Sequence, residues 1–202
     1  MASIEELKST ITAGGGPALP HQYLVQLPAI PGSSLGARER NALCKAARLP
    51  GRQILTYDRQ IGLMNQKMAY GYGVAEVTLV FHILNDYKTR DYFERWQNLA
   101  VDQASQQIQY SNNYKFPVQI YQLKKGQSFQ LFDRSFGFNL GPFGINFNID
   151  IEANRAATGV YAVELEKAFP TTLNGIDFAD ASTDQTLEIS VDLSYRNWKR
   201  IK

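Results

Sequence analysis

The sequence is poor in the residues that build disulfides and zinc sites. It contains one cysteine, Cys44, and two histidines, His21 and His82, in 202 residues. A single cysteine cannot form an internal disulfide, and two widely separated histidines provide little material for a metal centre. These shortages argue against a disulfide-stapled secreted domain and against a zinc site. We expect Cys44 to be a core or seam thiol within a strand.

Neither an excess of charge nor a long apolar run is present. Lysine and arginine number 21 and aspartate and glutamate 19, which gives a net charge of +2. This balance does not favour nucleic-acid binding. No stretch approaches the roughly 18 apolar residues of a membrane span, and the first residues lack the basic start and apolar run of a signal peptide. The sequence therefore predicts a protein made in the cytosol and not associated with a membrane.

Motifs that carry catalysis are also missing. There is no G-x-S-x-G element and no glycine-rich loop followed by Lys and Ser or Thr, so a nucleophile elbow and a phosphate loop are excluded. Glu164 and Glu166 lie two residues apart beside Lys167, which is typical of a polar, solvated strand face. The acidic loop with Asp177, Asp180 and Asp184 lacks the pattern of an EF-hand. We expect no enzyme activity, no cofactor and no metal.

What the sequence does contain is aromatic residues and short alternating segments. Aromatic side chains make up 12% of the chain, and residues of this kind favour pleated sheets. The length suits one domain, 1–202. Alternation and turn residues predict strands at 23–27, 41–47, 63–70, 74–84, 117–123, 159–167 and 186–195, with turns at 71–73 and a break at Pro170. The strand at 186–195 is the most regular of these.

Two helices are predicted. Residues 3–12 form a short amphipathic helix, which ends at the run of glycines at 14–16. This helix belongs to an N-terminal arm, 1–19. Residues 90–101 form the second helix, with Phe93 and Trp96 on its apolar face as the anchors that dock it onto a sheet. Two pairs of opposite charge, Arg90 with Glu94 and Asp91 with Arg95, have the four-residue spacing of helix ion pairs.

The segment 127–158 is expected to be a hairpin inserted into the domain. Apolar residues occur at nearly every second position from 127 to 151, and Gly141-Pro142 interrupts them as a hairpin turn does. So much apolar surface on a ribbon is unfavourable in water unless something covers it. We therefore predict contacts between subunits through Phe136, Phe138, Phe143, Ile145 and Phe147.

Several motifs between Cys44 and Asn98 resemble the tail tube proteins of T4-like contractile-tailed bacteriophages. They are Cys44-Lys45-Ala46 followed by Leu49-Pro50-Gly51, then Gly62-Leu63-Met64-Asn65-Gln66-Lys67-Met68, Leu84-Asn85-Asp86 and Phe93-Glu94-Arg95-Trp96-Gln97. The segment 186–195 is similar to the closing strand of that family, and the start around 20–27 is weakly similar. The insertion at 127–158 is longer and more aromatic than the family pattern.

The resemblance implies a mainly β fold: two packed antiparallel sheets forming a small barrel or sandwich with one flanking helix. It further implies a structural virion protein whose hexameric rings stack into the inner tail tube through which DNA is delivered without specific binding. The implied partners are the tail sheath, baseplate and tape measure proteins of the same phage, with assembly in the host cytoplasm. Glu188, Ser190 and Asp192, on the polar side of the closing strand, are then candidates to face the lumen.

Three alternatives remain open at this stage. The tail tube initiator of the baseplate shares the fold, and the insertion at 127–158 could belong to that role. The tube protein of type VI secretion shares the fold but not the motifs between Cys44 and Gln97. A small β-barrel that binds an apolar ligand would also explain the aromatic content.

Overall fold

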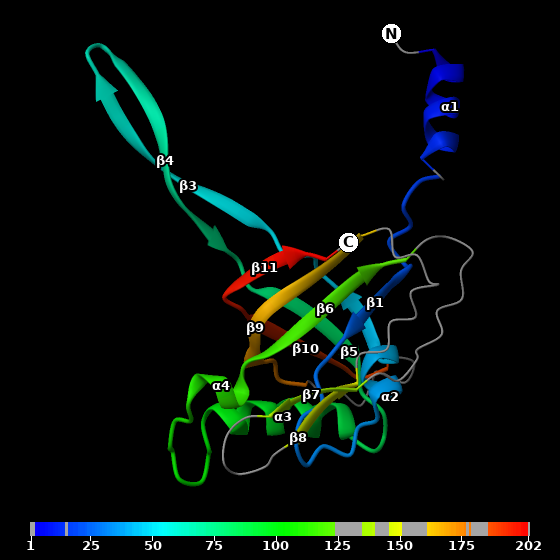
Figure 1. The fold of residues 1–202 in the computed structure, drawn as a ribbon. Coiled ribbons are helices and arrows are strands. Elements are labelled where there is room, and N and C mark those ends of the chain that lie inside the picture. The colour runs from blue at the N-terminus through cyan, green and yellow to red at the C-terminus, as the bar shows by residue number, and fades with distance from the viewer. Residues whose placement is uncertain are drawn as a thin grey trace.

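Two antiparallel sheets that share one long strand form the body of the protein (Figure 1). The computed structural model describes residues 3–14, 16–123, 135–139, 146–150, 161–176, 178 and 186–201. The first sheet contains β1 (Tyr23–Gln26), β6 (Phe116–Gln122), β9 (Tyr161–Leu173) and β11 (Asn197–Arg200). The second contains β9, β10 (Glu188–Ser194), β5 (Val77–His82) and β2 (Cys44–Ala47). The expected β-sandwich is confirmed, and the described strands do not close into a barrel.

Strand β9 passes from one sheet to the other at a bend. Its first part pairs with β6, and its last part, from Phe169 onward, pairs with β10. Between them Lys167 has φ 55°, a left-handed conformation that turns the strand. The predicted break at Pro170 is wrong, because β9 continues to Leu173. Pro170 is opposite Leu193, at the place where the register with β10 shifts, and such an irregularity tolerates a residue without an N–H.

The core fills the space between the sheets. The alternation predicted for the closing strand is confirmed: Ile189, Val191 and Leu193 are fully buried opposite the apolar side chains of β5. The first sheet contributes the other half of the core. Its buried members include Val25, Val118, Ile120, Val163 and Leu165.

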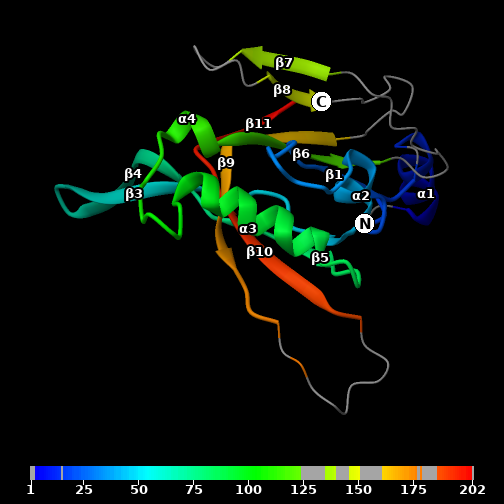
Figure 2. The ribbon, with the colours of Figure 1, turned by 90° about the horizontal axis from the view of Figure 1, so that it is seen from below.

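Helix α3 (Lys88–Ala100) lies between the two sheets at one end of the sandwich, as Figure 2 shows from below. Trp96, Phe93 and Tyr92 on its inner face have no exposed surface. The Phe93 ring lies 5.0 Å from that of Phe81 on β5, and the Trp96 ring lies 6.1 Å from that of Phe116 on β6. The helix therefore contacts both sheets and completes the core.

The outer face of α3 carries the predicted ion pairs. Arg90 Nε lies 2.6 Å from Glu94 Oε1, and Arg95 Nε lies 2.7 Å from Asp91 Oδ2. Exposed pairs of this spacing contribute only about 0.3 kcal/mol each. Packing of the aromatic face must therefore hold the helix.

A short helix bridges the open side of the sandwich, between the edge strands β1 and β2. The sequence analysis predicts one strand over 41–47, but α2 (Ala37–Ala42) comes first and only Cys44–Ala47 is extended. Asn41 of α2 accepts a hydrogen bond from the Leu27 amide, and the Tyr23 hydroxyl donates to the Cys44 carbonyl at 3.1 Å. Cys44 packs against the core at this seam, and burial raises the pKa of its thiol to about 12.

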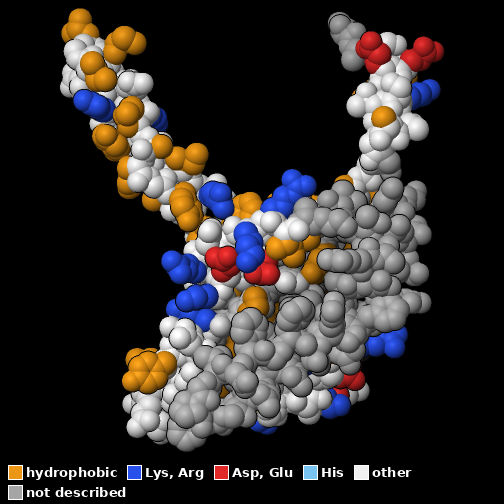
Figure 3. Space-filling model, viewed as in Figure 1, with side chains coloured by type: hydrophobic (Ala, Val, Ile, Leu, Met, Phe, Trp, Pro, Cys, Tyr) orange, Lys and Arg blue, Asp and Glu red, His pale blue; other side chains and the backbone are white. Residues whose placement is uncertain are grey.

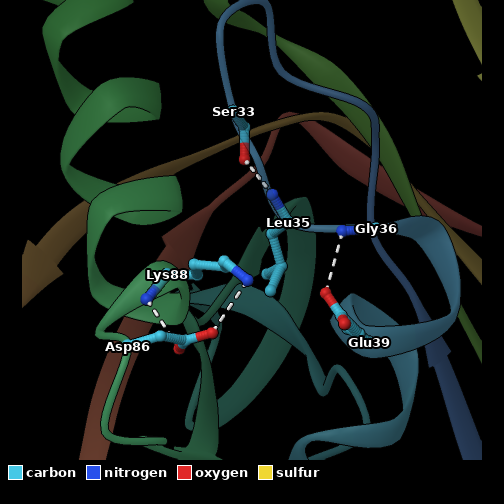
Figure 4. A network of polar contacts seen from close by, with 6 residues as sticks. All are labelled: Ser33, Leu35, Gly36, Glu39, Asp86 and Lys88. Atoms are coloured by element: carbon cyan, nitrogen blue, oxygen red, sulfur yellow. Dashed lines mark hydrogen bonds and ion pairs between the residues drawn. The ribbon is translucent and has the colours of Figure 1, made fainter.

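The loops that precede α2 and α3 lie side by side (Figure 4). The Gly36 amide donates to Glu39 at the start of α2, and the Lys88 amide donates to Asp86 at the start of α3. Lys88 Nζ is also 3.0 Å from Asp86 Oδ2, and this hydrogen bond holds the pKa of the Asp86 carboxyl below its usual range. Asp86 thus supplies an acceptor for the first turn of α3.

A helix and a hairpin project from the body at the same end, and a short helix and a pair of strands complete the described structure. Helix α1 (Ile4–Ala13) and the hairpin of β3 (Arg52–Ile61) and β4 (Met64–Val74) diverge from each other (Figure 1). The short helix α4 (Ser111–Tyr114) precedes β6, and β7 (Ser135–Asn139) pairs with β8 (Asn146–Asp150). No helix within the described ranges combines the length and apolar character needed to span a membrane.

Candidate subunit interface

The β3–β4 hairpin is a long two-stranded ribbon with a glycine at its tip. Its strands pair from Arg52 and Val74 at the base to Ile61 and Met64, next to a two-residue loop. Gly62, the first loop residue, has φ +64°, the conformation that glycine supplies at this position of a tight hairpin turn. Ten residues in a strand span about 30 Å, so the tip lies well outside the body.

The hairpin differs from the strand and turn that we expected in this part of the chain. We expected a strand over 63–70 that ended in a turn at 71–73, but β4 continues through those glycines and the chain reverses at 62–63. The sequence contains a signal for this hairpin: Leu55, Tyr57 and Ile61 precede a Gly-x pair at even spacing, and Met64, Met68 and Tyr70 follow it in the same way, which is typical of a hairpin.

The outer part of the hairpin has one apolar face and one polar face. A register shift between Leu55 and Thr56 leaves Tyr70 as the extra residue, and the Tyr70 ring lies 6.2 Å from that of Tyr57, so the two share a face. We call this the apolar hairpin face. It comprises Leu55, Tyr57, Ile61, Met64, Met68 and Tyr70, with Arg59 and Gln66 among them. The opposite face carries Thr56, Asp58, Gln60, Asn65, Lys67 and Ala69.

The apolar hairpin face is exposed to solvent. Met64 is 76% exposed, Tyr70 66% and Ile61 54%, and Leu63 in the loop is fully exposed. Figure 3 shows hydrophobic side chains gathered along the projecting hairpin. An isolated two-stranded hairpin is marginally stable in water, and a contiguous apolar surface on a soluble chain typically marks an interaction site. The outer hairpin therefore has the character of a surface that another protein covers.

The base of the hairpin is anchored to the last strand of the chain. The Arg52 guanidinium lies over the rings of Tyr72 and Trp198, at 5.2 and 4.6 Å from their centres. Arg52 also donates to the Trp198 carbonyl, and Trp198 Nε1 donates to the Gly51 carbonyl, each at 3.3 Å. Contacts of this kind fix the direction in which the hairpin leaves the body.

Two strands of the second sheet present polar residues to the outside. Glu188, Ser190 and Asp192, predicted to face a lumen, lie on the outer side of β10 opposite His82, Val80 and Thr78. All three are partly buried. Glu188 forms an ion pair with Lys45 of β2, and Asp192 accepts a hydrogen bond of 2.7 Å from Thr78. On this polar outer face Glu188 is paired with a lysine, and Asp192 is hydrogen-bonded within the subunit.

The outer side of the first sheet carries a second polar cluster. Lys199 Nζ lies 2.8 Å from Glu164 Oε1 and 3.4 Å from Glu166 Oε1. Glu164 also accepts a hydrogen bond from Gln119, and the hydrogen bond to Glu164 raises the pKa of Lys199. Lys199 thus pairs with both glutamates, and they are not arranged as an acid and a base.

Of the five residues predicted to contact other subunits, three lie on described strands and two do not. Phe136 and Phe138 lie on β7 and Phe147 on β8, and the antiparallel pairing of these strands is as expected for a hairpin. Phe143 and Ile145 lie outside the described residues, as do Asp177, Asp180 and Asp184. Within the described residues no group of His, Cys, Asp or Glu is arranged to hold a metal ion.

A family model for phage tail tube proteins matches residues 19–201. The chain belongs to the phage tail tube protein family. Members of this family are structural proteins and not enzymes, so the chain is a structural protein of the tail tube type. No curated protein sequence is significantly similar to it.

Solved structures with the same fold come from contractile injection systems. A chain in the cryo-EM structure of an extracellular contractile injection system, the PVC sheath-tube complex in its extended state, has 16% identity and a TM-score of 0.57, over 99% of this chain and 98% of that one. A chain of the six-fold symmetrised baseplate of the anti-feeding prophage has 17% identity and a TM-score of 0.56, over 92% and 95%. A chain of the cap that terminates the anti-feeding prophage tube has 16% identity and a TM-score of 0.55, over 91% and 90%. At these identities the similarity establishes the tail tube fold.

Proposed function

We propose that this tail tube family protein assembles into hexameric rings that stack into the inner tube of a contractile phage tail, through which DNA is delivered. The observation that carries the proposal is the β3–β4 hairpin, which extends about 30 Å from the body and whose apolar face is largely exposed. Covering this face with another copy removes apolar surface from water at roughly 25 cal/mol per Å². In a closed ring, neighbouring subunits also cover the strand edges of β1, β2 and β11, which are unpaired within the described residues.

The partners follow from the same proposal. Chains of this fold occur in structures titled as a sheath-tube complex, a baseplate and a tube cap. We propose that this chain contacts the tail sheath and the baseplate, and that a tape measure protein and then DNA occupy the lumen. The six-fold symmetry named for the baseplate supports six copies in a ring.

The polar outer face of the second sheet is our candidate for the lumen wall. Glu188, Ser190 and Asp192 present acceptors, and Lys45 neutralises Glu188. A wall that presents these acceptors, with Lys45 paired to Glu188, has little affinity for the phosphate backbone, which suits a channel that DNA must pass through.

A tail tube initiator is the second candidate, since a baseplate chain superimposes nearly as well as a sheath-tube chain. The two roles differ in growth: a tube subunit stacks on itself without limit, whereas an initiator stops after its own ring. A ligand-binding barrel is disfavoured because Trp96, Tyr92, Phe81 and Phe93 fill the interior within the described part of the chain.

A matched pair of substitutions at the hairpin tip tests the proposal. Met64→Asp puts a charge on the apolar hairpin face, whereas Asn65→Asp puts the same charge on the next residue of the opposite face. Neither residue is buried, so both variants fold. We expect stacked rings from the parent and from Asn65→Asp in negative-stain microscopy and sedimentation velocity, and a loss of stacking in Met64→Asp. A parent that remains monomeric at all concentrations, or a Met64→Asp variant that stacks like the parent, contradicts the proposal.

A further inference from the structure

Helix α1 is the second element that leaves apolar side chains uncovered. Ile4, Leu7 and Ile11 recur at helical spacing and form one stripe, and they are 73%, 58% and 44% exposed. No residue of the helix is buried. The N-terminus of the helix is nevertheless capped, because Ser3 and Glu6 form a reciprocal capping box. A well-capped helix of ten residues is still marginal alone in water, so it needs a surface to pack on.

The position of α1 limits what that surface can be. The helix and the hairpin leave the body at the same end but diverge toward opposite flanks (Figures 1 and 2). The helix of one copy therefore points away from its own hairpin. When two copies stand side by side in a ring, the helix of one comes to the flank where the other carries its hairpin.

The stripe of α1 is short enough to lie along the apolar hairpin face. The stripe from Ile4 to Ile11 is about 10 Å long, and the apolar hairpin face from Leu55 to Ile61 is about 20 Å long. Arg59 is the charged residue of that face and has no ion pair within the described residues. On α1 the stripe is flanked by Lys8, whereas Glu5 and Glu6 lie toward the far side of the helix, so the contact is apolar and does not include an ion pair with Arg59.

We propose that α1 of one copy packs its Ile4, Leu7 and Ile11 stripe on the apolar hairpin face of a neighbouring copy and so locks adjacent subunits together. The inference rests on the proposed assembly, but it concerns a segment that lies before residues 19–201, the part matched by the family model. It assigns the N-terminal arm a specific partner surface and explains how two elements that are exposed in one chain become buried in the assembly.

Disulfide trapping between copies tests the contact directly. Leu7 lies in the middle of the stripe and Met68 near the middle of the apolar hairpin face, so the pair meets whichever way the helix runs. Leu7→Cys and Met68→Cys are made in separate chains, the two are co-assembled and then mildly oxidised. We expect a cross-linked dimer of the two chains on a non-reducing gel. Cys44 remains in place, and the parent under the same oxidation accounts for any background.

Two control pairs keep the result specific. Ser9→Cys lies on the opposite side of α1, and Lys67→Cys lies on the opposite side of the hairpin. Mixtures of Ser9→Cys with Met68→Cys, or of Leu7→Cys with Lys67→Cys, should give at most a tenth of the cross-linked product. Equal yields from all mixtures overturn the inference.

A second measurement separates this inference from the proposed function. Leu7→Asp is expected to shift the protein concentration needed for assembly upward by at least tenfold, whereas Ser9→Asp leaves it unchanged. Tubes that form normally in Leu7→Asp, without a cross-link between Leu7→Cys and Met68→Cys, overturn the helix contact and leave the tube intact. A parent that never assembles overturns both. A cross-link within the double variant Leu7→Cys/Met68→Cys as a monomer would mean that the helix folds back on its own hairpin.

Discussion

Trp96 joins three parts of the fold. Its ring packs near Phe93 and Tyr92 of α3 and Phe116 of β6, and its Nε1 donates a hydrogen bond of 2.8 Å to the Tyr114 carbonyl. A buried aromatic with a satisfied N–H contributes both apolar burial and a specific orientation. One side chain therefore ties the helix, α4 and the first sheet together.

Truncation of this side chain should unfold the subunit before it affects assembly. We expect Trp96→Ala to lower the free energy of unfolding by about 3 to 5 kcal/mol, because it leaves a large cavity between helix and sheet. Chemical denaturation followed by circular dichroism measures the change. Tyr110→Ala, at a residue that is 84% exposed, is the control and should stay within about 0.5 kcal/mol of the parent. A Trp96→Ala protein that unfolds like the parent would show that α3 does not depend on this anchor.

At the scale of elements, two hairpins, β3–β4 and β7–β8, are candidates for the contact with a neighbouring subunit. The β3–β4 hairpin has its outer part described and exposed, and its base is anchored by Arg52 to Trp198. For β7–β8 the strand pairing is described, from Phe136 opposite Ile149 to Asn139 opposite Asn146. The proposal that its Phe side chains contact another subunit stays a prediction.

Deletion of the β7–β8 hairpin tests that prediction. Residues 136–147 are replaced by a short Gly-Ser linker, and the product is examined for folding and for assembly. We expect a folded protein that no longer forms rings, because the removed aromatic residues are covered by another subunit. An unfolded product would instead assign these side chains to the core of their own subunit.

The whole molecule combines a neutral body with apolar projections. Its net charge is +2, and both outer sheet faces carry ion pairs within the chain, Lys45 with Glu188 and Lys199 with Glu164. Self-repulsion between copies is therefore weak, and the surfaces proposed to meet are mainly apolar. The drive for assembly should come from the burial of apolar surface.

This composition predicts how assembly responds to salt. Raising the salt from roughly 0.1 M to 1 M screens ion pairs but does not weaken apolar contacts. We expect the fraction of protein in rings and tubes, measured by sedimentation, to stay constant or to increase, and sulfate to promote assembly further. Disassembly in 1 M salt would show that ion pairs between subunits dominate the interface.

The sequence by itself determined those elements whose side chains repeat with a clear period. The closing strand β10, the strand β5 and the helix α3 with Trp96 and Phe93 inward all follow from spacing, because one face of each element must be apolar to be buried. The motifs between Cys44 and Asn98 identified the family, which the match to residues 19–201 confirms.

Only the tertiary structure decided where the uncovered surface lies. Apolar residues alternate with a period of two both in a strand that lines a core and in a strand that projects from the body. The sequence therefore did not reveal that β3 and β4 pair with each other and project from the body. Likewise Pro170 and Gly71 to Gly73 have the character of breaks, yet β9 and β4 pass through them because neighbouring strands absorb the irregularities. Local propensity acts over a few residues, whereas pairing with a partner strand is settled by the whole chain.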